Sequence, residues 1–565
     1  MLYFLIFFWF IRETKAILFW HYLWQLKEYH IGRFIDHFRT EKGKRIFLNT
    51  LFFLKIFLLF LFLTTRPGLV IIYVLLVLYL FESVKAAKDF FQKRLLKPIL
   101  TKKTGVLIFT GLVLGIFFIF FNWSKPLPNF TLRLLIFDIL TPAITSGIIL
   151  IFQPLTILVR NQIIKKAKAK RAKFKDLIVI GITGSYGKTS TKEFLATILS
   201  EKIHPVKSRE AGISPKAKLF NRVKVLKTAE HQNSEVGISQ CILNDLKPEH
   251  EIFIVEMGAY NRGGIKLLCD ITKPKIGILT GINEQHMATF GSQENIIKTK
   301  FELIESLPED GIAIFNGDDE LIMSNVKVQM SNLNVKSKIF CSTKGKTDLW
   351  AQDIRLEKEQ VSFKVFSRDG DSADFKVNLF GAQNIENILL AATVAKELGM
   401  SLKEISMACE KIKQKQSGVK LIKKTKDGLN IIDATYSANP DGVISHLEYL
   451  KVWPGKKVIV MPCLIELGKA SKEVHKRIGQ KIGEVCDLAI ITTKERFKEI
   501  KEGAIENGLQ PSHHHPAEGG PLSKENILFL QNPNEIYNLI KNFNGPNDII
   551  LLEGRVSKEI FDKII

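Results

Sequence analysis

Residues 181–190 read GITGSYGKTS, a glycine-rich stretch that ends in a lysine and two hydroxyl side chains. The segment before it, residues 177–182, is a short apolar run of the kind that forms buried strands. The segment after it, residues 189–202, has apolar residues at helical spacing. A glycine-rich turn between a strand and a helix leaves backbone N–H groups free at the helix N-terminus, which is an anion site. The pattern therefore predicts a phosphate-binding loop.

Lys188 and Thr189 supply the side chains that nucleotide phosphates need. The Lys188 ammonium suits the outer phosphates, and the Thr189 hydroxyl suits Mg²⁺. The strict pattern G-x-x-x-x-G-K-[ST] would place a glycine at Ile182, so the match is G-x-x-G-K-[ST], from Gly184 to Thr189. A glycine-rich turn with a chance lysine is the alternative. The order of strand, glycines, Lys-Thr pair and helix favours the phosphate loop.

Two further candidate side chains follow predicted strands. Glu256 ends one apolar run, and His286 follows another at 275–282. Mg²⁺ on ATP takes a few hard ligands, and a carboxylate at a strand end beside the phosphate loop supplies one. An imidazole is a less usual Mg²⁺ ligand, so His286 taken alone fits a structural or loop histidine better. The sequence thus predicts ATP and Mg²⁺ as cofactors.

The elements that must position these residues alternate between strand-like and helical patterns from residue 176 onward. This alternation predicts α/β sheets that bind ligands at the carboxyl ends of their strands. A small hairpin is expected at 367–381. The other predicted buried strands are 251–258, 275–282, 311–319, 456–463, 488–493 and 547–554.

The first third of the sequence is instead strongly hydrophobic. Clear apolar runs cover about 46–64, 69–81, 105–121 and 134–159, and a soluble core does not explain them. A fifth run, 1–25, is interrupted by charged residues and could be a span or an interfacial helix. We therefore expect membrane-spanning helices.

Basic residues set the expected orientation of these spans. The segments 26–45, 83–104 and 160–175 are rich in Lys and Arg, whereas 65–68 and 122–133 are poor in them. This alternation follows the positive-inside rule. Everything after about residue 160 should then be cytoplasmic.

The composition limits the possible partners. The net charge of +23 lies largely beside the apolar runs, which favours a lipid bilayer over nucleic acid as its partner. The six cysteines are scattered singly, which argues against a zinc ribbon or disulfide framework and fits a reducing cytoplasm. The stretch SHHHP at 512–516 fits an ordinary polar loop better than a metal site.

Several motifs from 176 onward, in this order, resemble the Mur ligase family, whose members add amino acids or peptides to the muramoyl precursor of peptidoglycan. TGSYGKTS resembles the family's ATP loop. The wording and spacing of the other motifs are similar to the members that add D-alanyl-D-alanine. These motifs are NSEVGIS (233–239), EMGAYNRGGIKLL, PKIGILTGINEQHMATFGSQENIIKTKFELI, IIDATYSANPDGV (431–443) and IELG followed by His475.

The resemblance implies a role for each matching residue. Lys188, Lys300 and His286 would be catalytic, and Thr189, Glu256, His286 and a carbamylated Lys300 would serve the metal ions. The acceptor, a muramoyl peptide that is nucleotide- or lipid-linked, would face Asn233. The incoming D-alanyl-D-alanine-like amine would face Asp433, Tyr436 and Asn439. ATP would be held by Gly184, Ser185, Gly187, Lys188, Thr189 and Ser190, with Asn384 and Asn387 near the adenine.

The sequence also departs from the family pattern. Gln383 replaces the usual histidine before the first asparagine, and Ala434 and Ser437 replace residues of the DDTYNANP motif. SGVK stands where a Gly-Arg pair is expected near 418, and Cys463 replaces an aspartate of GDMLELG. Most of these changes concern the identity of the amine. Directly before the loop, membrane spans take the place of the family's uridine-nucleotide-binding domain.

We therefore expect membrane helices at 1–160 and a basic juxtamembrane linker at 161–175. A P-loop central domain with a parallel sheet is expected at 176–416, and a Rossmann-like α/β domain at 417–565. The expected function is an ATP-dependent, amide-forming ligase that acts through an acyl phosphate. A paralogue with a lipid-linked acceptor or another amine, and a non-catalytic membrane scaffold, are the alternatives.

Overall fold

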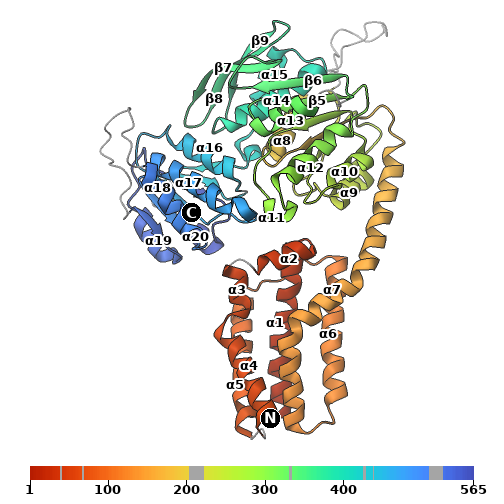
Figure 1. Cartoon of the computed structure of the whole chain (residues 1–565), viewed down its shortest axis with the longest axis vertical. Helices are drawn as coiled ribbons and strands as arrows, with labels where there is room; N and C mark the ends of the chain where they lie inside the picture. The colour runs from red at the N-terminus through yellow and green to blue at the C-terminus, as the bar shows by residue number, and fades with distance from the viewer. Residues whose placement is uncertain are drawn as a thin grey trace, which may run out of the picture. The chain divides into compact units, whose positions relative to one another are not determined.

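The apolar runs of the first third form long helices (Figure 1). The computed structural model describes residues 1–565 except 39–40, 66–68, 203–221, 330–333, 424, 426–427, 437 and 508–525. The histidines at 512–516 and Ser437 therefore lie outside the described residues. By its internal contacts the chain divides into two units, Met1–Asn161 and Gln162–Ile565.

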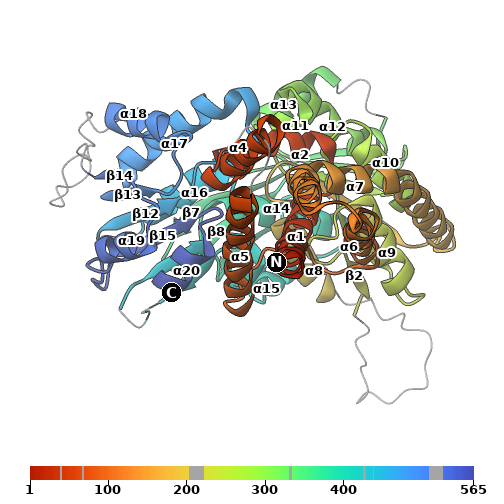
Figure 2. The same cartoon turned by 90° about the horizontal axis from the view of Figure 1, so that it is seen from below.

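The first unit is helical. Figure 2 shows α1 between α5 and α6, and α1 packs against both. Among the described residues, four helices are long and apolar enough to cross a membrane: Gly43–Thr64, Leu69–Phe91, Lys102–Asn122 and Leu127–Arg171. Its helices are α1 (Leu2–Leu26), α2 (Ile31–His37), α3 (Glu41–Phe47), α4 (Thr50–Thr64), α5 (Leu69–Phe91), α6 (Lys102–Asn122) and the long α7 (Leu127–Arg171).

The C-terminal end of α7 belongs to the second unit. Ile164 and Ala167 pack into the core of that unit. Arg171 donates hydrogen bonds to the carbonyl oxygens of Thr272 (2.8 Å) and Phe174 (2.6 Å). Much of the basic segment 161–175 is thus helix fixed to the second unit by specific contacts.

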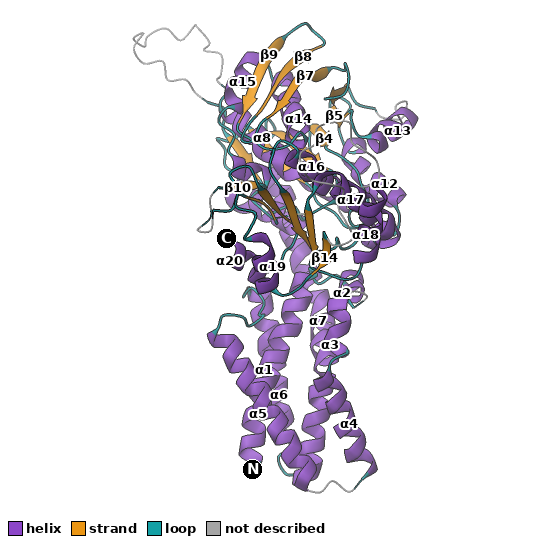
Figure 3. Ribbon diagram, turned by 90° about the vertical axis from the view of Figure 1, so that its left-hand side faces the viewer, coloured by secondary structure: helices purple, strands orange, loops and turns teal. Residues whose placement is uncertain are grey.

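The second unit contains two sheets (Figure 3). The described strands of the larger sheet run in the order β2-β3-β1-β4-β5-β6-β7-β8-β9, parallel through β7 and antiparallel thereafter. The hairpin predicted at 367–381 corresponds to the antiparallel β8–β9 pair, but its first strand, β8, begins before the predicted range. The strands are β1 (Ile178–Thr183), β2 (Val225–Lys227), β3 (Ile252–Glu256), β4 (Ile276–Leu279), β5 (Ile312–Asn316), β6 (Ser337–Ser342), β7 (Leu349–Leu356), β8 (Val361–Ser367) and β9 (Ser372–Val377).

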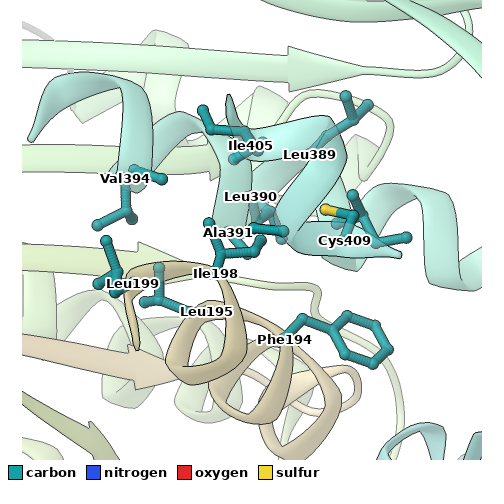
Figure 4. Close-up of a cluster of buried hydrophobic side chains, with 14 of the residues drawn as sticks. Phe194, Leu195, Ile198, Leu199, Leu389, Leu390, Ala391, Val394, Ile405 and Cys409 are labelled. Atoms are coloured by element: carbon teal, nitrogen blue, oxygen red, sulfur yellow. The ribbon is translucent and has the colours of Figure 1, made fainter. Parts of the chain in front are cut away.

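Helices cover both faces of this sheet, because successive strand residues point to opposite sides. Ile180 packs in the core under α8, α14 and α15, and Val179 packs in the core under α9, α10, α12 and α13. Figure 4 shows Leu195 and Ile198 of α8 in one apolar cluster with Leu390 and Ala391 of α14. The helices are α8 (Lys188–Ser200), α9 (Glu235–Asp245), α10 (Gly264–Thr272), α11 (Met287–Phe290), α12 (Gln293–Glu305), α13 (Glu320–Gln329), α14 (Gln383–Glu397) and α15 (Leu402–Cys409).

The smaller sheet has the order β10-β11-β15-β12-β13-β14 and is parallel except at β10. Its two faces are also covered by helices. This architecture confirms the expected fold class of apolar helices followed by two α/β parts. Its elements are β10 (Lys420–Ile422), β11 (Ile431–Ala434), α16 (Pro440–Leu450), β12 (Lys457–Met461), α17 (Ser471–Val485), β13 (Leu488–Ile491), α18 (Phe497–Asn507), β14 (Ile527–Phe529), α19 (Pro533–Ile540), β15 (Ile549–Glu553) and α20 (Lys558–Ile564).

Candidate active site

The glycine-rich loop joins the carboxyl end of β1 to the start of α8. Gly187 is the N-cap residue of α8, with φ of 76°, and no side chain caps this helix end. A Cβ on Gly187 would lie 2.5 Å from Asn387 Oδ1, so both its conformation and its neighbour require glycine. The uncapped N–H groups leave the helix end suited to an anion.

Lys188 is folded back over this loop. Its Nζ donates hydrogen bonds to the carbonyl oxygens of Gly184 (2.7 Å) and Ser185 (3.1 Å). Burial lowers the pKa of Lys188, and the Glu256 carboxylate partly opposes this effect. Among the described residues, no carboxylate lies within ion-pair distance of Lys188. An incoming phosphate would therefore meet an ammonium that is bonded only to neutral carbonyl groups.

Glu256, at the end of β3, connects the loop to the predicted acceptor residue. It accepts hydrogen bonds from Thr189 Oγ1 (3.0 Å) and Asn233 Nδ2 (3.1 Å). Burial by itself would raise the pKa of Glu256, but Lys192 and Lys188 act in the opposite direction and its pKa lies below the usual value. The structure thus brings together Lys188, Thr189, Glu256 and Asn233, around a carboxylate that is held ionised.

Lys192 is a member of this cluster that the sequence analysis missed. Its side chain is fully buried, and its Nζ lies 3.3 Å from Glu256 Oε2 and 3.4 Å from Glu193 Oε1. A signal was present, because Lys192 lies four residues after Lys188 and residues at that spacing share a helix face.

Lys300 lies on α12 and is only 4% exposed. Its Nζ is 5.7 Å from the centre of the Phe290 ring. Burial, assisted by repulsion from Lys188, lowers the pKa of Lys300 to about 7. A lysine with such a pKa is largely available as a neutral amine near neutral pH, which is the form that can react with CO₂.

His286 lies where the larger sheet's domain contacts the smaller one. Its Nδ1 is 2.6 Å from Glu466 Oε2, and its ring packs edge-on against Tyr260. Burial lowers the pKa of His286, although the hydrogen bond to Glu466 opposes this. Lys300 and Lys188 also act on this imidazole, so His286 is electrostatically part of the same cluster. A neutral imidazole can be a metal ligand.

Asn439, one of the three residues predicted to face the amine, also lies at this contact. Asn439 caps α16 through Gly442 N, and its Oδ1 accepts from Asn283 Nδ2 at 3.2 Å. The same Asn283 amide donates to Asp441 at 2.8 Å, a contact that the sequence analysis did not anticipate.

The other two residues predicted to face the amine lie on β11 or just after it. Asp433 lies on β11 and accepts from the Thr435 hydroxyl at 2.6 Å. Tyr436 is 44% exposed and stacks on the His231 ring at 5.9 Å.

The two predicted adenine-site residues differ in their surroundings. Asn387 contacts the loop region, since its Oδ1 accepts from Thr191 Oγ1 at 3.0 Å. Asn384 is buried, and its amide donates to the Phe380 carbonyl at 2.6 Å. The contact of Ser190 with the Ser417 carbonyl, at 3.4 Å, joins the loop to the segment that leads into the second sheet.

The donor set fits a magnesium ion carried on phosphates. No three His, Cys, Asp or Glu side chains gather as a metal site in the part of the chain that the structure describes. Mg²⁺ commonly uses one or two protein oxygens together with substrate phosphates. The adjacent Thr189 hydroxyl and Glu256 carboxylate, 3.0 Å apart, are a pair of this kind.

Known proteins share sequence and fold with both α/β parts of this chain. The Mur ligase middle domain matches residues 182–395, and the Mur ligase, glutamate ligase domain matches residues 419–556. A Bacillus subtilis UDP-N-acetylmuramoyl-tripeptide–D-alanyl-D-alanine ligase is 28% identical over 58% of this chain and 65% of its own length. The chain thus spans about two thirds of that relative.

Solved structures show the same fold. MurF from Acinetobacter baumannii has a TM-score of 0.59 at 23% identity, covering 72% of this chain and 80% of the other. MurF from Thermotoga maritima, solved in complex with ADP, has a TM-score of 0.56 at 24% identity, covering 72% and 83%. Because the two matched domains together cover more than half of the chain and coincide with its two sheets, the chain belongs to the Mur ligase family.

Proposed function

We propose that this chain is a membrane-anchored, ATP-dependent ligase of peptidoglycan precursor synthesis. It would join D-alanyl-D-alanine, or a similar amine, to the peptide of a muramoyl precursor. The observation that carries the proposal is the pair Lys188 and Lys192 beside the Glu256 carboxylate, at an uncapped helix N-terminus, with the buried Lys300 close enough to act on Lys188. The Bacillus subtilis relative, a UDP-N-acetylmuramoyl-tripeptide–D-alanyl-D-alanine ligase, supports the choice of substrates.

The proposed reaction has two steps. The acceptor carboxylate attacks the γ-phosphorus of ATP, ADP leaves, and an acyl phosphate forms. The amine nitrogen then attacks the acyl carbon, and phosphate leaves with the former carboxylate oxygen. Both steps concentrate negative charge, so catalysis depends on positioning and on electrostatic stabilisation.

The residues of this chain would divide that work between them. The N–H groups at the start of α8 and the Lys188 ammonium would hold the phosphates, with Ser185, Ser190 and Asn387 shaping the loop. Mg²⁺ bound by Thr189 and Glu256 would neutralise charge on the phosphates. The contacts His286–Glu466 and Asn283–Asp441 would hold the amine-binding domain against the loop and exclude water from the acyl phosphate.

The helical unit would anchor the enzyme in the bacterial inner membrane with both sheets in the cytoplasm. Four helices of sufficient length and hydropathy and the alternation of basic segments support this placement. A lipid-linked acceptor is the second candidate substrate, because an anchored enzyme shares the bilayer with such a lipid and tethering raises effective concentration.

Replacing Lys188 tests the phosphate site. Lys188→Ala should reduce product formation by about 10²–10³-fold, the usual effect of losing one group that stabilises developing charge. The side chain bonds only to loop carbonyls, so circular dichroism should change little. Phosphate release by the detergent-solubilised chain is the measurement, with the exposed Lys273→Ala as the control. Near-normal turnover of Lys188→Ala would disprove the assignment.

The proposed carbamate on Lys300 is tested by following its formation at different pH values and by replacing the lysine. Because its pKa is about 7, its neutral fraction grows as pH rises through about 7. Carbamate formation from ¹³C-labelled bicarbonate, followed by NMR, should therefore increase with pH over that range. Lys300→Ala should be nearly inactive and partly rescued by short carboxylic acids, whereas the exposed Lys298→Ala on the same helix should be normal. Full activity of Lys300→Ala without rescue would remove Lys300 from the site.

Membrane orientation is tested by labelling single cysteines from outside the cell. Ser124→Cys, in the segment between α6 and α7, should react with an impermeant maleimide. Lys93→Cys, just after α5, should react only once the cells are opened. The six native cysteines are buried and should give little background. The reverse labelling pattern would overturn the proposed topology.

The acceptor is tested by comparing nucleotide-linked and lipid-linked substrates in liposomes. Residues 162–171 belong to the second unit and pack on its core. The shortened variant for comparison therefore lacks only residues 1–161 and keeps Arg171. If the lipid-linked acceptor is the substrate, the full chain should use it faster than the shortened variant does. If the full chain and the shortened variant use the nucleotide-linked acceptor equally fast, and neither uses the lipid-linked acceptor, the membrane unit serves only as an anchor.

A further inference from the structure

Five ionisable side chains from four helices meet inside the first unit. Arg12 and Glu13 come from α1, Lys55 from α4, Glu82 from α5 and Asp138 from α7. The side chains of Glu13, Lys55 and Asp138 are 2%, 4% and 0% exposed. This charged cluster is separate from the phosphate site and plays no part in the reaction described above.

The cluster lies near the middle of the proposed membrane span. At about 1.5 Å per residue, Glu13 is roughly 16 Å along α1 from Leu2. That distance is close to half of the roughly 30 Å hydrocarbon core of a bilayer. Charged side chains at such depth are costly, and they mark functional sites more often than structural ones. The inference rests on the proposed membrane placement, but not on the proposed ligase activity.

Four of the five groups neutralise one another. Arg12 pairs with Asp138, and its Nε lies 3.6 Å from Glu82. Lys55 lies 2.7 Å from Glu82 and 2.9 Å from Asp138. Two cations and two carboxylates thus form a closed quartet that ties α1, α4, α5 and α7 together.

Glu13 is the fifth group, and it leaves one carboxylate in excess. It lies 2.8 Å from Arg12, which already pairs with Asp138. No further cation compensates it among the described residues of the unit. Lys15 pairs with Asp89 at 2.7 Å, and Arg133 is exposed and donates to Asn122.

The two uncharged titratable groups nearby do not compensate it either. The buried Tyr79 hydroxyl has no hydrogen-bond partner, and His21 bonds to the Ile17 carbonyl on its own helix. A net negative charge in this low-dielectric interior would be unfavourable.

The contacts of Glu13 show how the excess negative charge can be neutralised. Thr141 Oγ1 lies 2.5 Å from Glu13 Oε1 and 2.9 Å from the Phe137 carbonyl oxygen. A hydroxyl has one hydrogen, and a carbonyl oxygen has none to give. If Thr141 donates to Phe137, as threonines in helices commonly do, the hydrogen of the shorter contact must come from Glu13. A protonated Glu13 satisfies both contacts and makes the cluster neutral.

We propose that the membrane unit binds one proton at Glu13, between Arg12 and Thr141, at neutral pH. The proton would lie at the contact between α1 and α7, where its loss would leave an unpaired carboxylate. The packing of these two helices would then depend on proton activity at the membrane. A cluster with all three carboxylates ionised, or one neutralised by a bound Na⁺, is the opposing account.

Infrared spectroscopy tests the proposal directly. The full chain is reconstituted in vesicles of phosphatidylethanolamine and phosphatidylglycerol, and the C=O stretch of a protonated carboxyl is recorded at neutral pH. We expect such a band in the native chain and its loss in Glu13→Gln. Asp89→Asn, which alters a neighbouring pair outside the cluster, is the control and should keep the band. Absence of the band from the native chain, or its persistence in Glu13→Gln, would overturn the proposal.

Thermal unfolding in the same vesicles distinguishes loss of the proton site from loss of the fold. Glutamine carries the same donor and acceptor as a protonated glutamate, so Glu13→Gln should leave the unfolding midpoint unchanged. Asp138→Asn should lower it, because Arg12 and Lys55 would then share one carboxylate fewer. An equal decrease of the unfolding midpoint in both variants would show that Glu13 is ionised. The same conclusion would follow if Na⁺ raised the unfolding midpoint of the native chain and the infrared band were absent.

Discussion

Glu256 and the buried ammonium groups around it are the constraint on which the catalytic part of the structure depends. Lys192 is fully buried and pairs with Glu256, which also accepts from Thr189 and Asn233. Lys188 adds an ammonium that no carboxylate pairs with directly among the described residues, and its Nζ bonds only to carbonyl oxygens of the loop. Buried charge without compensation is unfavourable. The polyphosphate of a nucleotide, bound at the N-terminus of α8, would supply a negative partner for the Lys188 ammonium.

The sequence could predict the fold and the centre of this site because both depend on local patterns. The phosphate loop could be predicted because its strand, glycines, Lys188 and Thr189 are consecutive in the sequence. The position of Glu256 beside the loop could be predicted because neighbouring parallel strands end at the same edge of a sheet. The partners of His286 and Asn439 could not be predicted. Glu466 and Asn283 reach them from other segments, and only tertiary packing brings these segments together. The spacing of Lys192 from Lys188 was a usable signal. In the sequence, however, a lysine on a helix looks the same whether its side chain is buried or exposed.

The N-terminal helical unit also contains buried charges whose meeting could not be predicted from the sequence. Apolar runs and basic loops are readable from the sequence, whereas the meeting of Arg12, Lys55, Glu82 and Asp138 depends on how four helices pack. The charges in the run 1–25, which by themselves left α1 ambiguous as a span, have partners on α5 and α7. The candidate active site holds the Lys188 ammonium without a direct carboxylate partner among the described residues and fits phosphate, whereas the charged cluster of the helical unit has more carboxylates than cations and fits a proton.

Isotope transfer from the acceptor carboxylate to phosphate tests the proposed amide formation through an acyl phosphate. The solubilised full chain would be given ATP, Mg²⁺, D-alanyl-D-alanine and a muramoyl tripeptide whose reacting carboxylate carries ¹⁸O. Mass spectrometry should show a product extended by one dipeptide, and the released phosphate should contain one ¹⁸O atom from the carboxylate. ATP hydrolysis that yields unlabelled phosphate and no extended product would contradict the account.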